Sequence, residues 1–180
     1  MKRYPLDVAV IIIGRNASAY VRQALQSLQA AEWAKYRHEV IYVDNASTDD
    51  TREMLREFPQ VRTIFNQKNL GFCKAGNQAV AITGARHYLF LNDDTIVLGD
   101  AIVRLTRFLD ETPDAGVVGA RLLYPDLSEQ WSGRRFPTPL NGLLGRRSLL
   151  TRVFPNANPV RSYLFKDQIS GDVQIGRAHV

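Results

Sequence analysis

The order of apolar runs along the chain restricts the fold more than any other feature of this sequence. Four runs rich in β-branched, aromatic or leucine residues stand at 7–13, 38–45, 61–66 and 88–91, and the stretches between them carry apolar residues at helical spacing. Strands that alternate with helices form βαβ units, which build a parallel sheet with helices on both faces. The sequence therefore predicts an α/β fold.

The predicted helices have apolar faces and recognisable starts. The first follows Ser18, a residue that favours the N-cap position, and the second follows the capping residues of ASTDD. A third, Ala-rich helix begins near Gly71. The residues expected to face the core are Val21, Ala24, Leu25 and Leu28 in the first helix and Met54, Leu55 and Phe58 in the second.

Length and composition fit one globular domain or a piece of one. The chain has 180 residues and is 45% hydrophobic, which is enough to bury one substantial core. No apolar stretch reaches the roughly 18 residues of a membrane span, and the amino end lacks the pattern of a signal peptide. We therefore expect a cytoplasmic protein. The single cysteine, Cys73, has no Cys or His close by in sequence and is expected to be a buried small apolar residue.

The net charge of +5 is concentrated in the last third of the chain. Residues 1–120 hold 14 Lys or Arg and 14 Asp or Glu, whereas residues 121–180 hold 9 and 4. Paired arginines at 134–135 and 146–147 are not interleaved with stacking aromatics, which argues against a nucleic-acid partner. Anionic lipid, a phosphorylated substrate and a solvated basic surface are the readings left open.

Polar residues follow each of the four predicted strands. They are Gly14, Arg15 and Asn16 after the first strand, Asp44 and Asn45 after the second, Asn66 and Asn69 after the third, and Asn92, Asp93 and Asp94 after the fourth. Any one group alone is typical of a turn or a helix cap. Open parallel sheets, however, bind ligands beyond the carboxyl ends of their strands, so the four groups together predict one binding site.

The loop after the first strand excludes two nucleotide-binding motifs. It reads GRNASAY, with one glycine, so it is not the GxGxxG of dinucleotide-binding enzymes, and the chain contains no GxxxxGK[ST]. A site without a glycine cradle can neutralise a diphosphate with a divalent cation. Mg²⁺ or Mn²⁺ is commonly held by one or two carboxylates together with phosphate oxygens and water, which suits the group at 92–94.

Several stretches together resemble the family 2 glycosyltransferases, which have the GT-A fold. VAVIIIGRN resembles the first strand and loop of that family, IYVDNASTD its second-strand signature, NLGFCKAGNQA the start of its next helix, and LNDDT its metal-binding DxD motif. The resemblance runs in order from about residue 7 to about residue 125. RLLYPDLSEQWSGRRFPTP further resembles the branch that includes rhamnosyltransferases of bacterial surface polysaccharides.

The resemblance implies a Rossmann-like GT-A sheet with a donor-binding core at 1–125 and the start of a basic acceptor-side region at 126–174. It also implies a role for each matching residue. Asn16, Asp44 and Asn45 would contact the base and ribose of a dTDP- or UDP-sugar, Asn69, Lys74 and Asn77 would lie near the diphosphate, Asp94 would bind the metal, and Asn92 and Asp93 would make sugar, ribose or water-mediated contacts. Asn92 departs from the family pattern, because many relatives have Asp there, and Gly14 and Arg15 stand where Thr and Tyr are frequent.

The implied reaction is inverting sugar transfer to a glycan or lipid-linked acceptor of a bacterial cell surface, at the inner face of the membrane and with peripheral contact to it. In the family a carboxylate of the carboxyl-terminal half is the general base. The late acids Asp126, Glu129, Asp167 and Asp172 lack a matching context, so no catalytic base is assigned. A non-catalytic module that binds nucleotide-sugars is the alternative function.

The last residues are expected not to belong to the natural protein. IGRAHV is also the translation, in one frame, of a widely used DNA-sequencing adapter. We therefore expect residues 175–180 to be read-through and the acceptor-side part to be truncated. Adapter sequence in the underlying DNA would establish this, and a genuine stop codon in unrelated genomic sequence would refute it.

Overall fold

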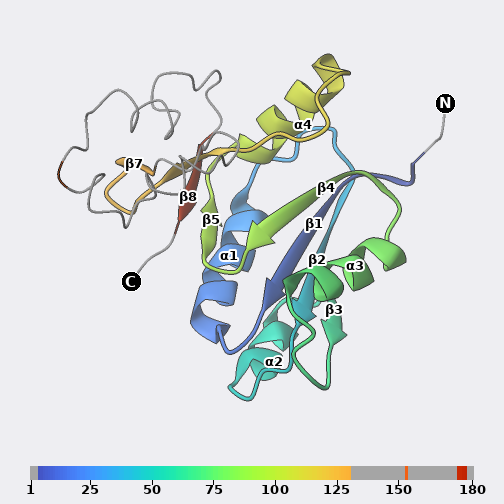
Figure 1. The fold of residues 1–180 in the computed structure, drawn as a ribbon, viewed down its shortest axis with the longest axis vertical. Helices are drawn as coiled ribbons and strands as arrows, with labels where there is room; N and C mark the ends of the chain where they lie inside the picture. Colours follow the sequence, from blue (N-terminus) through green and yellow to red (C-terminus); the bar gives the residue numbers. More distant parts are fainter. Residues whose placement is uncertain (1–3, 131–152, 154–173, 178–180) are drawn as a thin grey trace.

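The computed structural model describes residues 4–130, 153 and 174–177, and its centre is a parallel sheet of four strands (Figure 1). The strands are β1 (Leu6–Gly14), β2 (His38–Asp44), β3 (Arg62–Phe65) and β4 (Ala85–Asn92). Their order across the sheet is β3-β2-β1-β4, and every neighbouring pair is parallel. The chain first adds strands on one side of β1 and then places β4 on the other side. This confirms the predicted α/β fold and puts a topological switch point between β1 and β4.

Helices cover both faces of the sheet (Figure 1). They are α1 (Ser18–Ala30), α2 (Thr51–Met54), the 3-10 helix η1 (Leu55–Glu57), α3 (Phe72–Ile82) and α4 (Ala101–Glu111). Alternate residues of β1 face opposite sides, as the pleat of a strand requires. Val8, Val10 and Ile12 join the core under α1, α2 and α4, while Ile11 joins a smaller core under α3.

The helix faces predicted from sequence are those that the fold buries. Val21, Ala24, Leu25 and Leu28 of α1 are buried, and so are Met54, Leu55 and Phe58 of the second helical segment. That segment is shorter than its pattern indicates, because the α-helix ends at Met54 and continues as one 3-10 turn. On the other face, small residues of α3 let this helix lie close to the sheet. A β-carbon on Gly76 would come within 3.0 Å of Phe90 on β4.

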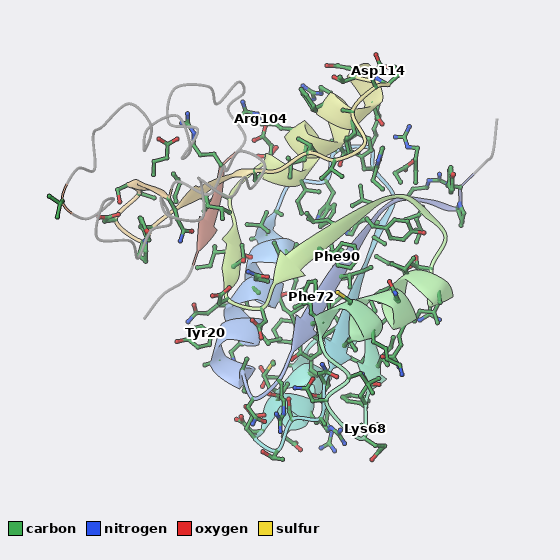
Figure 2. The ribbon with its side chains drawn as sticks, in the orientation of Figure 1. Tyr20, Lys68, Phe72, Phe90, Arg104 and Asp114 are labelled. Atoms are coloured by element: carbon green, nitrogen blue, oxygen red, sulfur yellow. The ribbon has the colours of Figure 1, made fainter. Side chains whose placement is uncertain are left out.

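Several apolar or aromatic residues of β4 and α3 are exposed. Tyr88 and Phe90 of β4 have 38% and 46% of their surface accessible, because β4 is an edge strand of its sheet in the described part of the chain. Phe90 contacts Phe72 at the start of α3, with ring centroids 6.2 Å apart (Figure 2). Cys73 is also exposed, since it lies off the face of α3 that Ala75 and Ala79 turn toward the sheet. The prediction of a buried thiol is wrong.

A second small sheet lies beside the first. It contains β5 (Thr95–Val97), β6 (Arg121–Leu123), β7 (Glu129–Gln130) and β8 (Gln174–Arg177), in the order β5-β8-β6-β7. Strand β8 overlaps the segment 175–180 that was expected to be adapter read-through, and that expectation stays a prediction about the DNA. The boundary between the donor-binding core and the acceptor-side region also stays a prediction.

Much of the predicted basic region lies outside the described residues. This holds for the paired arginines at 134–135 and 146–147 and for Asp167 and Asp172. Within the described ranges, no helix is both long enough and apolar enough to cross a membrane.

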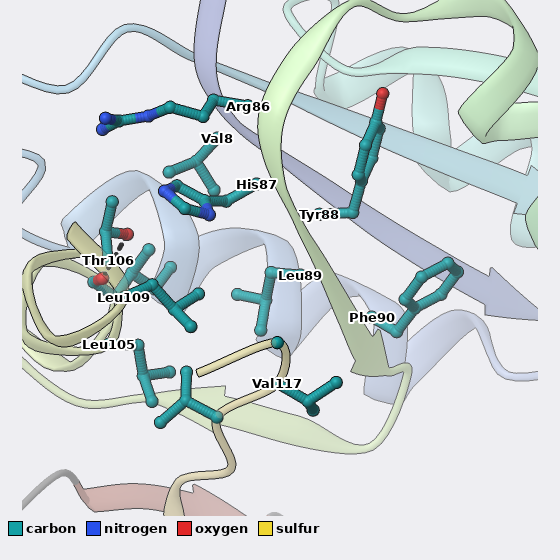
Figure 3. Close-up of a pocket in the computed structure, with 13 residues that line it drawn as sticks. Val8, Arg86, His87, Tyr88, Leu89, Phe90, Leu105, Thr106, Leu109 and Val117 are labelled. Atoms are coloured by element: carbon teal, nitrogen blue, oxygen red, sulfur yellow. Dashed lines mark hydrogen bonds between the residues drawn. The ribbon is translucent and has the colours of Figure 1, made fainter. Parts of the chain in front are cut away.

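A cavity of about 360 Å³ lies between β4, α4 and the segment at 116–118 (Figure 3). Apolar side chains such as Leu89, Leu105 and Val117 line most of it. Near His87, Asp110 of α4 accepts a hydrogen bond from Arg86 and contacts the His87 ring at 3.0 Å. None of the predicted site residues lines this cavity.

The start of α2 is held by Asp49. Its Oδ1 accepts hydrogen bonds from the backbone N–H of Thr51 at 3.1 Å and from the Thr51 hydroxyl at 2.6 Å. Its Oδ2 accepts from the backbone N–H of Ser18, at the start of α1. Desolvation opposes the charged form of Asp49, but the hydrogen bonds from Thr51 and Ser18 outweigh it and lower the pKa of this carboxyl. One carboxylate thus joins the starts of two helices.

We predict that Asp49→Ala lowers the free energy of unfolding at pH 7 by about 1 kcal/mol, the usual contribution of a side-chain cap. Because the folded-state pKa is lowered, this stabilisation is complete above the ordinary aspartate pKa of 3.8 and is lost as the pH falls through the lower pKa of the folded state. Urea unfolding of both proteins across this pH range measures it. Asp50→Ala is the matched control, since Asp50 makes no capping bond through its side chain. Equal stabilities of the Asp49 and Asp50 variants would contradict the assignment.

Candidate functional site

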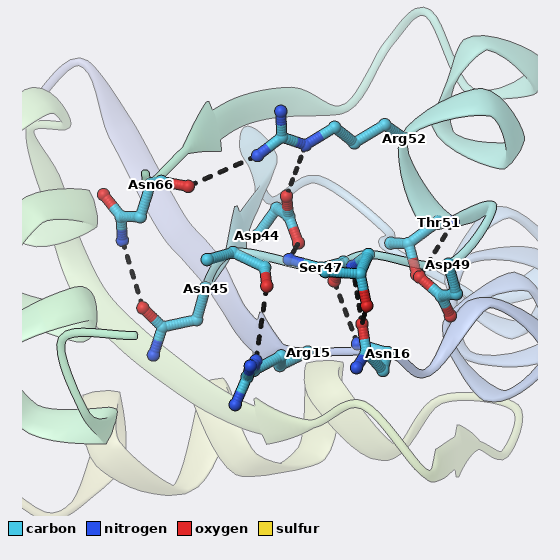
Figure 4. A network of polar contacts seen from close by, with 11 residues as sticks. Arg15, Asn16, Asp44, Asn45, Ser47, Asp49, Thr51, Arg52 and Asn66 are labelled. Carbon is cyan, nitrogen blue, oxygen red and sulfur yellow. Dashed lines mark hydrogen bonds and ion pairs between the residues drawn. The ribbon is translucent and has the colours of Figure 1, made fainter. Parts of the chain in front are cut away.

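The polar groups predicted from four strand ends meet at the carboxyl edge of the main sheet. The strand register places Gly14 beside Asp44 and Ile13 beside Asn92. Asp44 in turn lies beside Phe65, so that the residues after β3 follow at the same level. Figure 4 shows part of the resulting network. The convergence expected from the sequence is therefore present in the structure.

The loops after β1 and β2 are bound to each other by side chains. Asn16 has a positive φ of 54°, a conformation that Asn tolerates better than most residues. Its backbone N–H donates to the Ser47 hydroxyl at 2.9 Å, and its Oδ1 accepts from the Thr48 N–H at 2.7 Å. Arg15 donates through Nε to the carbonyl of Ala46 at 3.2 Å. These bonds tie Asn16 and Arg15, at the carboxyl edge of the sheet, to the loop after β2.

Asp44 lies inside the protein, below the edge. Its side chain has 0% exposure, its Oδ2 accepts from Arg52 Nε at 2.8 Å, and its Oδ1 accepts from the Ser47 N–H at 3.0 Å. Arg52 also donates to the Asn66 carbonyl and lies over the Phe65 ring. A carboxylate with no exposed surface cannot touch a nucleotide unless this ion pair opens. The ion pair gives Asp44 a structural role at the end of β2, and its predicted contact with base and ribose stays a prediction.

Asn45 is the centre of a partly buried chain of amides. Its Oδ1 accepts from the Leu70 N–H at 2.9 Å and from Asn66 Nδ2 at 3.3 Å, while its Nδ2 donates to Asn69 Oδ1 at 2.8 Å. Asn66 exchanges two further hydrogen bonds with Gln78 of α3. These bonds fix the loop that leads into α3 through Gly71, whose φ of 75° few other residues adopt. The network brings the predicted residues Asn45 and Asn69 together.

The other residues predicted for the diphosphate lie farther out. Lys74 and Asn77 are exposed on α3 and take part in none of the hydrogen bonds of the amide network. Sequence reasoning did not find Arg52 and Gln78, which hold the network together. Both resemble ordinary polar residues of a helix surface, and only the fold places them beside Asp44 and Asn66.

The turn after β4 carries the two carboxylates expected to bind a cation. Asn92 is exposed, and Asp93 and Asp94 are half-buried. Burial raises the pKa of the Asp93 carboxyl, and the neighbouring charge of Asp94 raises it further. Two neighbouring carboxylates at the switch point of the sheet offer a place for a cation.

The carboxylates of Asp93 and Asp94 fit a cation that takes its remaining ligands from a phosphate and from water. The described ranges contain no group of three or more His, Cys, Asp or Glu side chains arranged to hold a metal by themselves. Mg²⁺ and Mn²⁺ do not need such a group, because one or two carboxylates suffice when phosphate oxygens and water complete the shell. Asp93 and Asp94 provide that number.

We predict an asymmetry in stability between the two partners of the buried ion pair. Arg52→Ala leaves the fully buried Asp44 without its cation and should cost about 3 kcal/mol of unfolding free energy. Asp44→Ala should cost less, about 1 kcal/mol, since Arg52 is 44% exposed and can return to water.

Urea unfolding followed by circular dichroism measures both variants. Arg56→Ala is the control, because Arg56 and its partner Glu53 are 76% and 71% exposed and such a pair contributes at most about 1 kcal/mol. An Arg52→Ala protein as stable as the Arg56→Ala protein would show that the ion pair does not hold the strand end.

Comparison with known proteins places the fold and its polar edge in a family. The profile of the family described as "Glycosyl transferase family 2" matches residues 9–167. The chain is 27% identical over 108 residues to the putative teichuronic acid biosynthesis glycosyltransferase TuaG of Bacillus subtilis. The aligned residues make up 58% of this chain and 42% of TuaG. The range matched by the family profile includes all four strand ends of the edge.

Solved structures show the same fold. S. aureus TarS 1-349 in complex with UDP-GlcNAc has a TM-score of 0.56 and 23% identity over 74% of this chain and 37% of its own. The mannosyltransferase PcManGT from Pyrobaculum calidifontis, in complex with GDP-Man and Mn²⁺, has a TM-score of 0.54 and 20% identity over 68% of this chain and 38% of its own. The chain thus spans less than half the length of each of these proteins. Its fold is GT-A-like, and the chain belongs to glycosyl transferase family 2.

Proposed function

We propose that this chain is the donor-binding part of an enzyme that transfers a sugar, with inversion, from a dTDP- or UDP-sugar to a glycan or lipid-linked acceptor of a bacterial cell surface. The observation that carries the proposal is that the polar groups after all four parallel strands, among them Asn16, Asn69 and the 92–94 turn, lie along the carboxyl edge of one sheet. TuaG and TarS support this class of enzyme by similarity, and the nucleotide-sugars bound by TarS and PcManGT support the class of donor.

The exposed polar residues of the edge are the proposed contacts of the nucleotide-sugar. Asn16 lies at the outer rim beside Arg15, where a base and ribose can reach both. Lys74 and Asn77 are exposed on α3 and can meet the negative charge of a diphosphate. Asn45 is only 4% exposed, so we propose that it acts by shaping the loop that carries Asn69. Asp44 supports the edge through Arg52, and we propose that it contacts base and ribose when this ion pair opens.

The turn at 92–94 is the proposed cation site. Asp94 is the proposed direct ligand of Mg²⁺ or Mn²⁺, and Asn92 and Asp93 make the contacts to sugar, ribose or water. When bound, the cation would stabilise the negative charge that builds on the leaving nucleoside diphosphate. Asp93 Oδ2 lies beside Gly14 at the end of β1. The Mn²⁺ bound by PcManGT supports a divalent cation in this family.

In the proposed transfer, the acceptor hydroxyl oxygen bonds to the anomeric carbon while the bond from that carbon to the diphosphate oxygen breaks. The hydroxyl proton passes to a general base. Two late acids in the described part of the chain are engaged elsewhere: Glu129 pairs with Arg121 at 2.8 Å, and Asp126 accepts hydrogen bonds from Ser128. No residue is proposed as the base. Contact of the basic region with the inner face of the membrane stays a prediction.

We predict that the chain is stabilised against thermal unfolding by UDP or dTDP, and more strongly when Mn²⁺ is present. Asp94→Ala should remove the Mn²⁺-dependent part, with a loss of about tenfold in affinity, or about 1.4 kcal/mol. Asp93→Ala should have a smaller effect. A thermal-shift series with each nucleotide, with its sugar conjugates and with Mn²⁺ present or absent measures these differences.

The matched control is Asp114→Ala, an exposed aspartate just after α4 and away from the polar edge (Figure 2). It should respond to nucleotide and Mn²⁺ as the wild type does. Absence of any nucleotide-dependent shift in the wild-type chain would refute the proposed function. Equal Mn²⁺ dependence in the Asp94→Ala and wild-type proteins would refute the cation site alone.

A further inference from the structure

The phenol of Tyr42 is a buried polar group that the fold leaves without a partner. Tyr42 lies on β2, has 0% exposure and packs in the core under α1. Its hydroxyl makes no hydrogen bond to any residue in the described part of the chain. Leaving such a group unsatisfied is destabilising, and most buried hydroxyls in proteins have a partner. The position of this hydroxyl therefore needs a reason.

The hydroxyl lies beside the end of β1, where Gly14 leaves room for it. A β-carbon on Gly14 would come within 3.0 Å of two oxygen atoms, the Tyr42 hydroxyl and Asp93 Oδ2. Tyr42 comes from β2 and Asp93 from the turn after β4, and these two strands flank β1 on opposite sides. The phenol and the carboxylate thus approach each other across the end of β1, in space that any side chain on Gly14 would fill.

Three carboxylates act on the Tyr42 phenol, and Asp93 is the one placed to accept a hydrogen bond from its hydroxyl. Burial raises the pKa of the Tyr42 phenol, and the charges of Asp93, Asp44 and Asp49 raise it further, so the phenol keeps its proton and can donate it. Two of these carboxylates are already engaged: Asp44 by Arg52 and the Ser47 N–H, and Asp49 by Thr51. Asp93 is the carboxylate whose oxygen shares the space at Gly14 with the hydroxyl.

We propose that the Tyr42 hydroxyl donates a hydrogen bond to the Asp93 carboxylate and thereby positions the 92–94 turn for its ligand. Tyr42 is then a positioning residue, since it acts through Asp93 and does not itself touch the nucleotide. The bond draws negative charge on Asp93 toward the core, so that Asp94 is the carboxylate presented to a cation. The consequence for ligand binding rests on the proposed function, whereas the hydrogen bond itself does not.

The first experiment tests the hydrogen bond without any ligand. Aspartate carboxyl carbons are labelled with ¹³C, and their NMR signals are compared between the wild type and Tyr42→Phe. We expect the Asp93 signal to shift more than those of Asp44 and Asp49. Tyr36→Phe is the matched control, because the Tyr36 hydroxyl bonds to Asp110 at 3.3 Å, and in that variant Asp110 should shift and Asp93 should not. An Asp93 signal that Tyr42→Phe leaves unchanged would overturn the proposal.

The second experiment tests positioning, with UDP as the probe in the presence and absence of Mn²⁺. We expect Tyr42→Phe to weaken Mn²⁺-dependent UDP binding about threefold to tenfold, the effect of losing one hydrogen bond, and to leave Mn²⁺-free binding unchanged. In an Asp93→Ala background the same substitution should have no further effect. A purely structural role would instead weaken both kinds of binding, and unchanged binding in both would also overturn the positioning role.

These two experiments separate this inference from the proposed function. If the wild-type chain binds no UDP, the proposed function fails, while the carboxyl signals still decide whether the hydrogen bond exists. If UDP binds and the Asp93 signal does not respond to Tyr42→Phe, only the inference about Tyr42 is wrong.

Discussion

The burial of β1 between two parallel neighbours is the constraint on which the polar edge depends. Val10, Ile11 and Ile12 have no exposed surface, and their side chains fill cores on both faces of the sheet. A slip of one residue in either pairing would turn these side chains to the wrong faces, so the register is strongly fixed. Fixed register makes the strands end at the same level. Residues from four distant parts of the sequence meet at the edge for this reason.

The polar edge has an inner layer that supports it and an outer layer that a ligand can reach. Asp44, Asn45 and Asn66 are at most 7% exposed. Asp44 is bonded to Arg52, and Asn66 is bonded to Asn45 and Gln78. Buried polar groups must be paired in this way, because an unpaired one loses its hydration without compensation. The inner layer therefore gives the loops their shape. The outer residues, among them Lys74 and Asn92, are exposed.

The residues that we propose as a site in this family 2 chain concern the sugar donor and not the acceptor. All residues proposed to contact the nucleotide-sugar or its cation come from β1 to β4, from the loops that follow these strands, and from helix α3. The acceptor side has no comparable set in the described part of the chain, where Asp126 and Glu129 serve a turn and an ion pair. The proposal for this chain therefore concerns the donor side.

The sequence by itself determined the order of strands and helices, the buried faces of α1 and α2, and the edge at which Asn16, Asp93 and Asp94 gather. Periodicity can do this because it reports which side of an element faces the core. It does not report what a neighbouring strand places opposite a given residue. Only the tertiary structure therefore buried Asp44 against Arg52, exposed Phe90 on an edge strand, and brought the Tyr42 hydroxyl and the Asp93 carboxylate together beside Gly14.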